Sequence, residues 1–419
     1  MALDDKWFEL IKPINAKLPT RLSNTSYRDT RVNFFSSSGT EPIFETAELK
    51  CDLGRYREMI DELKNKVDQD KSVPEAVAEL YQAKLEEKSR QIDLLSVLQK
   101  IKYNHCEEAD LEYAQTLTEK IYTYPRQDIF NHLFNTVVKK LTGNWSDKSD
   151  TDSHQRLSSV FDKERPTAVL DCGNLYTQAN LDNSTPITSA EMVINTFRAA
   201  LKKYGLLDWS VEVNTADRAA IMVWPRGRRI SIPKDSILKN RTNKLTSLKI
   251  EGLIQHEIFT HALRVTNGAN SNLKLLSIGL DAYLRGEEGL AAHREWSVTG
   301  GEDYSGFMPY LVAGLAYGLD REGERRTFKE VFNIIKDYFN LLYGNTRDVN
   351  SLAFSACSRI FKVNHRFVFT RDCVYREGHI KVSRLLAEQK IDDDVLNLGK
   401  YDPTNKRHTK SLRQIEILK

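Results

Sequence analysis

Two histidines and a glutamate lie close together in the stretch LTSLKIEGLIQHEIFTHALRVTNG, where His256, Glu257 and His261 form an H-E-x-x-x-H pattern. In the shorter H-E-x-x-H pattern of zinc peptidases, both histidines lie on one helix face and bind the metal, while the glutamate is the general base. Here one extra residue separates the histidines, and residues five apart differ by about 140° around a regular helix. An inserted residue re-phases a helix, and such bulges favour functional sites, so we predict a π-type bulge between Glu257 and His261.

A zinc site built on two histidines needs a third protein ligand and an open position for water. The chain can turn at Asn267-Gly268 and return on a second helical stretch, YLRGEEGLAAHREW. This stretch offers four candidate ligands: Glu287, Glu288, His293 and Glu295. The residues alone leave the choice open, and a solvated helix face is the competing interpretation of these side chains. Two unrelated histidines without any metal are the competing interpretation of the H-E-x-x-x-H pattern.

A later segment, RFVFTRDCVYREGHIKVSR, concentrates polar groups that could assist hydrolysis. Tyr375 and His379 are four residues apart and share one face if the segment is helical, so either side chain could stabilise an oxyanion. A terminal carboxylate is bound well by arginine, whose planar fork makes paired hydrogen bonds. Six arginines lie in this half of the chain: Arg264, Arg359, Arg366, Arg371, Arg376 and Arg384. Arg371 and Arg376 are favoured as substrate-binding residues because they flank the Tyr375 and His379 pair.

HEIFTHALRVTNG followed by EEGLA resembles the microtubule-associated tyrosine carboxypeptidase (MATCAP) family, whose bacterial members are named for a QEGLA motif. The resemblance extends from about residue 44 to about residue 390 and is specific at HEIFTH and EEGLA. It implies that His256, His261 and Glu288 bind zinc and that Glu257 is catalytic. The resemblance, and not the spacing, selects Glu288. Glu287 stands where the QEGLA name has glutamine.

The resemblance implies a zinc-dependent metallocarboxypeptidase, with tubulin tyrosine as its substrate. A bound metal lowers the pKa of its water from about 15.7 toward about 7, and Glu257 accepts the proton and passes it to the leaving amine. A zinc endopeptidase is the first alternative. A non-catalytic regulatory or binding protein is the second, and a closed site with His293 as fourth ligand would favour it.

The pattern along the chain indicates an α+β fold, which is mostly helical and zincin-like, with a small mixed sheet beside the active-site helix. The sheet is expected from three short runs, WSVEVN, AAIMVW and RRISIP. By analogy with thermolysin-like peptidases, RISIP is expected beside the substrate backbone. The expected organisation is an extended segment over 1–43, a helical subdomain over 44–142, a polar linker over 143–166, the zincin-like catalytic domain over 167–395 and a C-terminal tail over 396–419.

The composition of the chain indicates which partners, metal ligands and cellular location to expect. The chain has 61 Lys and Arg against 58 Asp and Glu, a formal charge of +3, which gives no reason to expect a nucleic-acid or membrane partner. Its five cysteines form no C-x-x-C pair, so a metal would have to use histidine and carboxylate. The N-terminus MALDDKWFEL lacks the features of a secretory signal, and a cytoplasmic protein is expected. The expected partner is a peptide or protein C-terminus.

Overall fold

The protein is described here by a computed structural model, which covers residues 2–22, 27–37, 40–102, 106–143, 151–168, 186–214, 220–239, 245–300, 306–389 and 391–418. Helices dominate these ranges and one three-stranded mixed sheet accompanies them, which confirms the α+β prediction. None of the helices in these ranges is both long and apolar enough to cross a membrane.

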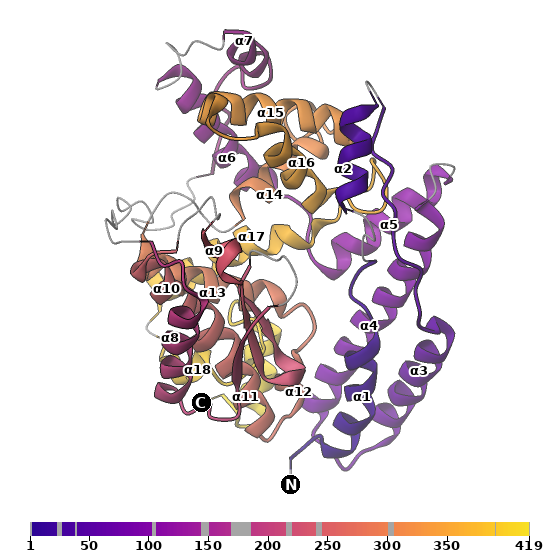
Figure 1. Cartoon of the computed structure of the whole chain (residues 1–419). Helices are drawn as coiled ribbons and strands as arrows, with labels where there is room; N and C mark the ends of the chain where they lie inside the picture. The colour runs from indigo at the N-terminus through magenta and orange to yellow at the C-terminus, as the bar shows by residue number, and fades with distance from the viewer. Residues whose placement is uncertain are drawn as a thin grey trace.

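The N-terminal helices form the first hydrophobic cluster, on the right of Figure 1. They are α1 (Asp5–Lys17), α3 (Leu53–Gln69), α4 (Glu75–Ile101) and α5 (Glu108–Ile121), with α2 (Tyr27–Ser36) further along the molecule. The prediction of an extended segment over 1–43 is therefore wrong. Trp7, Ile11 and Ile14 recur at helical spacing and are buried, so α1 gains its stability by burying that stripe.

The second cluster lies at the top of Figure 1. It contains α6 (Gln127–Thr142), α7 (Thr151–Val160), α14 (Phe307–Ala316), α15 (Phe328–Tyr343) and α16 (Val349–Ile360). Helix α7 falls within the predicted polar linker, so that prediction is wrong for the described part of 143–166. Arg156 and Ser153 of α7 both bond the Asp337 carboxylate of α15, which ties this polar segment to the core.

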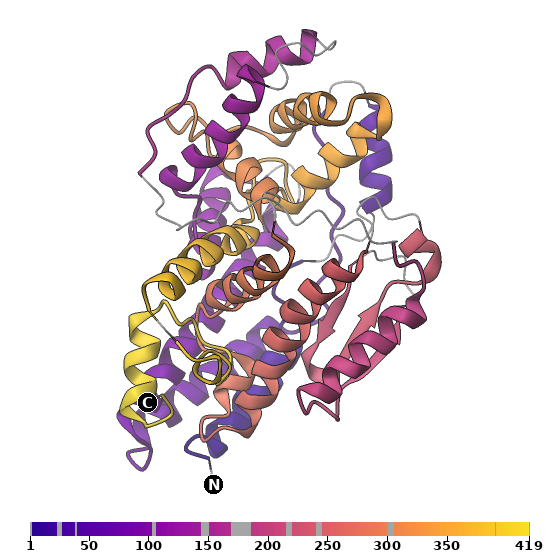
Figure 2. The ribbon, with the colours of Figure 1, turned by 90° about the vertical axis from the view of Figure 1, so that its left-hand side faces the viewer.

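The third cluster contains the sheet and the helices packed on it. Its elements are α8 (Ala190–Lys203), β1 (Ser210–Val213), β2 (Met222–Trp224), β3 (Arg229–Ile232), α9 (Asp235–Lys239), α10 (Ser247–Leu253), the π-helix η2 (Ile254–Ala262) and α11 (Leu263–Asn270). The strand order is β1-β3-β2, with β3 parallel to β1 and antiparallel to β2. The predicted mixed sheet is thus confirmed, and Figure 2 shows α8 running alongside it.

The remaining elements complete the C-terminal half. They are α12 (Leu275–Ile278), α13 (Leu284–Thr299), α17 (Cys373–Glu388), α18 (Asp393–Leu396), α19 (Lys406–Gln414) and the short 3-10 helices η1 (Pro225–Gly227), η3 (Gly344–Thr346) and η4 (Thr370–Asp372). The prediction of a tail over 396–419 is wrong. Tyr401, His408 and Leu412 are buried, because this segment packs back onto α4 and the loop before α13.

Helices α13 and α17 cross with their backbones in contact, at the glycines of the EEGLA and YREGH motifs. A Cβ atom added to Gly289 would lie 2.3 Å from the carbonyl carbon of Gly378. A Cβ added to Gly378 would lie 2.0 Å from the carbonyl oxygen of Arg285. Both obstacles are backbone atoms, which no rotamer change can move. The glycines therefore set the distance between the two helices.

We expect Gly289→Ala to lower the free energy of unfolding by about 3 kcal/mol, because the helices must separate to admit the methyl group. Chemical denaturation followed by circular dichroism measures this change. Gly227→Ala is the matched control, since the nearest side-chain atom to its added Cβ is 3.9 Å away. Equal stability of the two variants would show that the helix crossing tolerates a side chain.

Candidate metal centre

The H-E-x-x-x-H segment is wound as a π-helix over Ile254–Ala262, which confirms the predicted departure from α-helical winding. The wide turn spans more residues than the single bulge that was predicted. The Thr260 hydroxyl donates to the carbonyl of Gln255, five residues earlier, at 2.9 Å. With this winding the two imidazoles lie together, with ring centroids 5.1 Å apart for His256 and His261.

Arg294 of α13 stabilises the irregular winding from outside. Its guanidinium donates to the carbonyl of Phe259 at 3.0 Å and to the Thr260 hydroxyl at 3.1 Å. It also lies over the Phe259 ring, 4.3 Å from the centroid. A buried backbone carbonyl that lacks a hydrogen-bond donor destabilises the folded state. A charged donor such as a guanidinium makes a strong hydrogen bond to such a carbonyl. Sequence reasoning missed Arg294, although it lies two turns after Glu287 on the same helix face.

Three side chains converge in a geometry that could hold a metal ion. Among the described residues, His256, His261 and Glu288 offer ligand atoms that all lie within 4.8 Å of one another. The Glu288 Oε2 atom is 3.9 Å from Nε2 of His256 and 3.6 Å from Nε2 of His261. Ligand atoms around a tetrahedral zinc ion lie about 3.3 Å apart, so a small inward movement would complete the site.

The other ring nitrogens of the two histidines bond further carboxylates of α13. Nδ1 of His256 is 2.8 Å from Glu295 Oε2, and Nδ1 of His261 is 2.9 Å from Glu287 Oε1. Metal-bound histidines usually donate this second N–H to a carboxylate, which fixes the tautomer and the ring orientation. The donor set therefore suits a metal ion, and Glu287 and Glu295, both considered as ligands, hold the histidines instead.

Glu287 is kept ionised by cations around it. Its carboxylate bonds the fully buried Arg264 guanidinium and lies 3.8 Å from the Lys400 ammonium. Burial acts to raise the pKa of Glu287, but the charges of Arg264 and Lys400, with the hydrogen bond from His261, lower it to about 2. Arg264, a candidate for substrate binding, is thus a structural arginine. Lys400 comes from the predicted tail, and no local pattern marked it.

Glu257 follows the first histidine and lies partly exposed beside the three candidate ligands. Within the described ranges its carboxylate makes no hydrogen bond or salt bridge. Burial raises the pKa of Glu257, while the two neighbouring histidines oppose that shift. A carboxylate without a competing partner and with a raised pKa is suited to accept and return a proton.

Tyr375 and Arg371 lie close enough to Glu288 for its charge to affect the pKa of both side chains. The negative charge of Glu288 is the largest cause of the raised pKa of Tyr375, so the phenol stays protonated near that carboxylate. Burial acts to lower the pKa of Arg371, but Tyr122, Tyr375 and the nearby carboxylates raise it. Neither side chain makes a hydrogen bond to any described residue. Both therefore remain able to donate to a bound ligand.

His379 and Arg376 lie elsewhere. His379 is 2% exposed between α13 and α17, with its ring centroid 6.1 Å from that of Trp296. Burial and the Arg376 charge lower the pKa of His379 to about 3. Arg376 is buried as well, and its charge adds to the effect of burial in lowering the pKa of His132 on α6. Tyr375 precedes the helix crossing at Gly378 and His379 follows it, so the two side chains meet different neighbours despite sharing a helix face.

Other candidate residues have partners away from the site. Nδ1 of His293 is 2.8 Å from the Ser383 hydroxyl, so His293 is not a fourth ligand. Arg359 pairs with Asp372 at 2.8 Å, and Arg366 pairs with Glu108 at 2.6 Å. Arg384 is exposed on the far side of α17.

The strand that packs against the π-helix is not the strand that was expected there. RISIP forms β3, whose two sides are both paired within the sheet, so its backbone cannot also pair with a peptide. The prediction for RISIP is wrong. The edge strand β2 is the one that packs against η2.

A family model described as "Microtubule-associated tyrosine carboxypeptidase" (MATCAP) matches residues 161–419. No curated protein and no solved structure matches the chain. The match begins later than the expected resemblance, which started near residue 44, and it continues through the C-terminus. It contains every residue of the candidate metal centre, and it covers more than half of the 419 residues. The chain therefore belongs to the MATCAP family.

Proposed function

We propose that the chain is a zinc-dependent metallocarboxypeptidase that removes a C-terminal tyrosine, the activity in the family's name. The observation that carries the proposal is the convergence of His256, His261 and Glu288, with a further carboxylate on Nδ1 of each histidine. Two histidines and one carboxylate are the ligand set of zinc peptidases that keep a position open for water. The packing of edge strand β2 on η2 supports a zincin-like arrangement.

In this proposal Glu257 transfers the proton and Tyr375 donates a hydrogen bond during hydrolysis. Zinc held by His256, His261 and Glu288 would lower the pKa of a water molecule and polarise the scissile carbonyl. Glu257 would accept the proton and return it to the leaving amine. The Tyr375 hydroxyl donates a hydrogen bond to the developing oxyanion. His379 is left out of the mechanism because it is buried between α13 and α17.

Arg371 is the residue we assign to the terminal carboxylate of the substrate. It is partly buried, makes no hydrogen bond to a described residue and lies near Tyr375 and Glu288. A guanidinium in that position distinguishes a free C-terminus from an internal peptide bond. Arg376, the other arginine favoured from sequence, is left out because it is buried. The family's name further suggests a substrate associated with microtubules.

Glu257→Gln is expected to retain metal and lose activity. The amide cannot accept a proton, so kcat for release of tyrosine from a peptide should fall about 10²- to 10⁴-fold. Metal content by mass spectrometry should remain at one ion per chain. Glu251→Gln, at an exposed position six residues earlier, is the matched control and should behave as wild type. Full activity of Glu257→Gln would remove this residue from its role.

Glu295→Gln is expected to weaken zinc binding about 10- to 100-fold, because an amide orients the His256 ring less firmly. Competition with a chromophoric chelator measures the change. The side chain of Glu295 is 33% exposed, so the substitution should leave the fold intact. Zinc affinity equal to that of Glu251→Gln would mean that the Glu295–His256 bond does not support the metal.

Peptides with free and amidated C-termini test the exopeptidase assignment. We expect cleavage of a peptide that ends in a free tyrosine and none of its amide. Arg371→Met should lower kcat/KM on the free peptide about 10- to 100-fold, since a charged hydrogen bond is lost. Arg366→Met, which breaks an exposed pair with Glu108, is the control. Equal cleavage of both peptides would identify an endopeptidase instead.

A further inference from the structure

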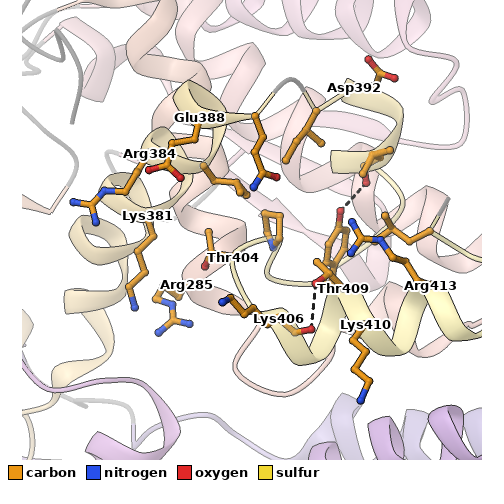
Figure 3. Close-up of a pocket in the computed structure, with 17 residues that line it drawn as sticks. Arg285, Lys381, Arg384, Glu388, Asp392, Thr404, Lys406, Thr409, Lys410 and Arg413 are labelled. Atoms are coloured by element: carbon orange, nitrogen blue, oxygen red, sulfur yellow. Dashed lines mark hydrogen bonds between the residues drawn. The ribbon is translucent and has the colours of Figure 1, made fainter. Parts of the chain in front are cut away.

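A cavity of about 1060 Å³ lies between α17 and α19 (Figure 3). None of the candidate metal ligands lines it. Arg384 on its wall is nine residues after Tyr375 in α17, which places the two side chains about 180° apart around the helix. The cavity therefore opens on the face of α17 opposite to the metal centre, and the proposed hydrolysis makes no use of it.

The walls of this cavity are two helix faces. The first wall is formed by α17 through Lys381, Arg384, Leu385 and Glu388. The second wall is formed by α19 through Lys406, Thr409, Lys410 and Arg413. Both sets repeat at three- and four-residue spacing, so each helix presents one continuous stripe to the cavity. The cavity is a groove between two helices.

Cations outnumber acids along this groove. Its lining includes two acidic residues, Glu388 and Asp392, and six basic residues, namely Arg285, Lys381, Arg384, Lys406, Lys410 and Arg413. Figure 3 shows Arg384 and Lys381 on the left, Arg285 and Lys406 below the centre, and Lys410 and Arg413 on the right.

Among the described residues, one of these six cations is paired with a carboxylate. Arg285 bonds the buried Asp402 carboxylate at 3.0 Å. The other five make no salt bridge or side-chain hydrogen bond to any residue within the described ranges. Burial is the largest cause of the lowered pKa of Lys381, and repulsion from the Arg285 charge adds to it, while Glu377 and Asp402 act in the opposite direction. An anionic ligand would relieve this repulsion.

The floor of the groove is apolar. Leu385, Ile391 and Val395 line it and are partly buried, while Tyr401 and Leu418, which also line it, are buried. A compact polyphosphate would use the charges and leave these aliphatic groups in water. A peptide that carries both carboxylates and an apolar side chain would satisfy both features.

We propose that the groove between α17 and α19 binds an acidic peptide segment of a partner protein, with its carboxylates over the cations and an apolar side chain on the floor. Charge complementarity and the partly exposed aliphatic side chains of the groove carry this assignment. It is independent of the proposed hydrolysis, because the groove and the metal centre share no residue. Loss of peptide binding and loss of hydrolysis can therefore be observed separately.

The test uses the full chain and a fluorescein-labelled peptide, Glu-Glu-Leu-Glu-Glu-Leu-Glu, with an amidated C-terminus. Fluorescence anisotropy should give saturable binding that weakens as salt is raised. Lys406→Glu with Lys410→Glu should weaken binding at least 10-fold and leave the hydrolysis of short peptides unchanged. Lys202→Glu with Lys203→Glu, exposed on α8, makes the same change in net charge and should bind as wild type. A peptide with serine in place of both leucines should bind several-fold more weakly.

Three results would overturn the proposal. The first is the absence of peptide binding. The second is equal binding by the two double variants, which would place the contact elsewhere. The third is tight binding of inositol hexakisphosphate at the groove without binding of the peptide, which would identify a polyphosphate site.

Discussion

The π-helical winding of Ile254–Ala262 is the constraint on which the candidate centre depends. With regular α-helical winding, His256 and His261 would point apart and no ion could join them. The wide turn removes this conflict. Arg294 supports the turn from outside by donating to Phe259 and Thr260. Helix α13 therefore supports the winding with one residue and completes the ligand set with another, Glu288.

The candidate centre also brings several ionisable groups together, and their charges must be compensated. Three carboxylates of α13 face two imidazoles, and such a cluster is unstable unless each group has a partner. Glu287 is neutralised by Arg264 and Lys400, and Glu295 is bonded to His256. Glu288 remains as the carboxylate between the two Nε2 atoms. The arrangement holds the histidines in place and leaves the third carboxylate for a cation.

The N-terminal helices lie outside the matched family region, yet they brace the connection that leads to α13. The Asp4 carboxylate accepts the backbone N–H groups of Lys274 and Leu275, both at 2.8 Å. Glu87 of α4 accepts the N–H of Ala282, a residue with φ of 48°. These contacts fix the loop that returns the chain from the π-helix to the EEGLA segment. Residues before position 161 thus contribute to the geometry of a centre that they do not line.

Local spacing was sufficient for several features of this protein. The extra residue in H-E-x-x-x-H predicted the π-type winding, and short runs of β-branched and aromatic residues predicted the three strands. These features depend on interactions within a few residues of the chain. The helix over Asp5–Lys17 was equally readable from the spacing of Trp7, Ile11 and Ile14 and was missed, because polar composition further along suggested an extended segment.

Tertiary structure alone decided which side chains meet. From sequence, Glu287, Glu288 and Glu295 were equivalent acids on one helix, and only the family resemblance preferred Glu288. Their different contacts follow from how α13 lies against η2. Tyr375 and His379 share a helix face, yet the glycine crossing at Gly378 separates their surroundings. Helical periodicity determines which residues share a face, whereas the point at which two helices cross determines what each of those residues contacts.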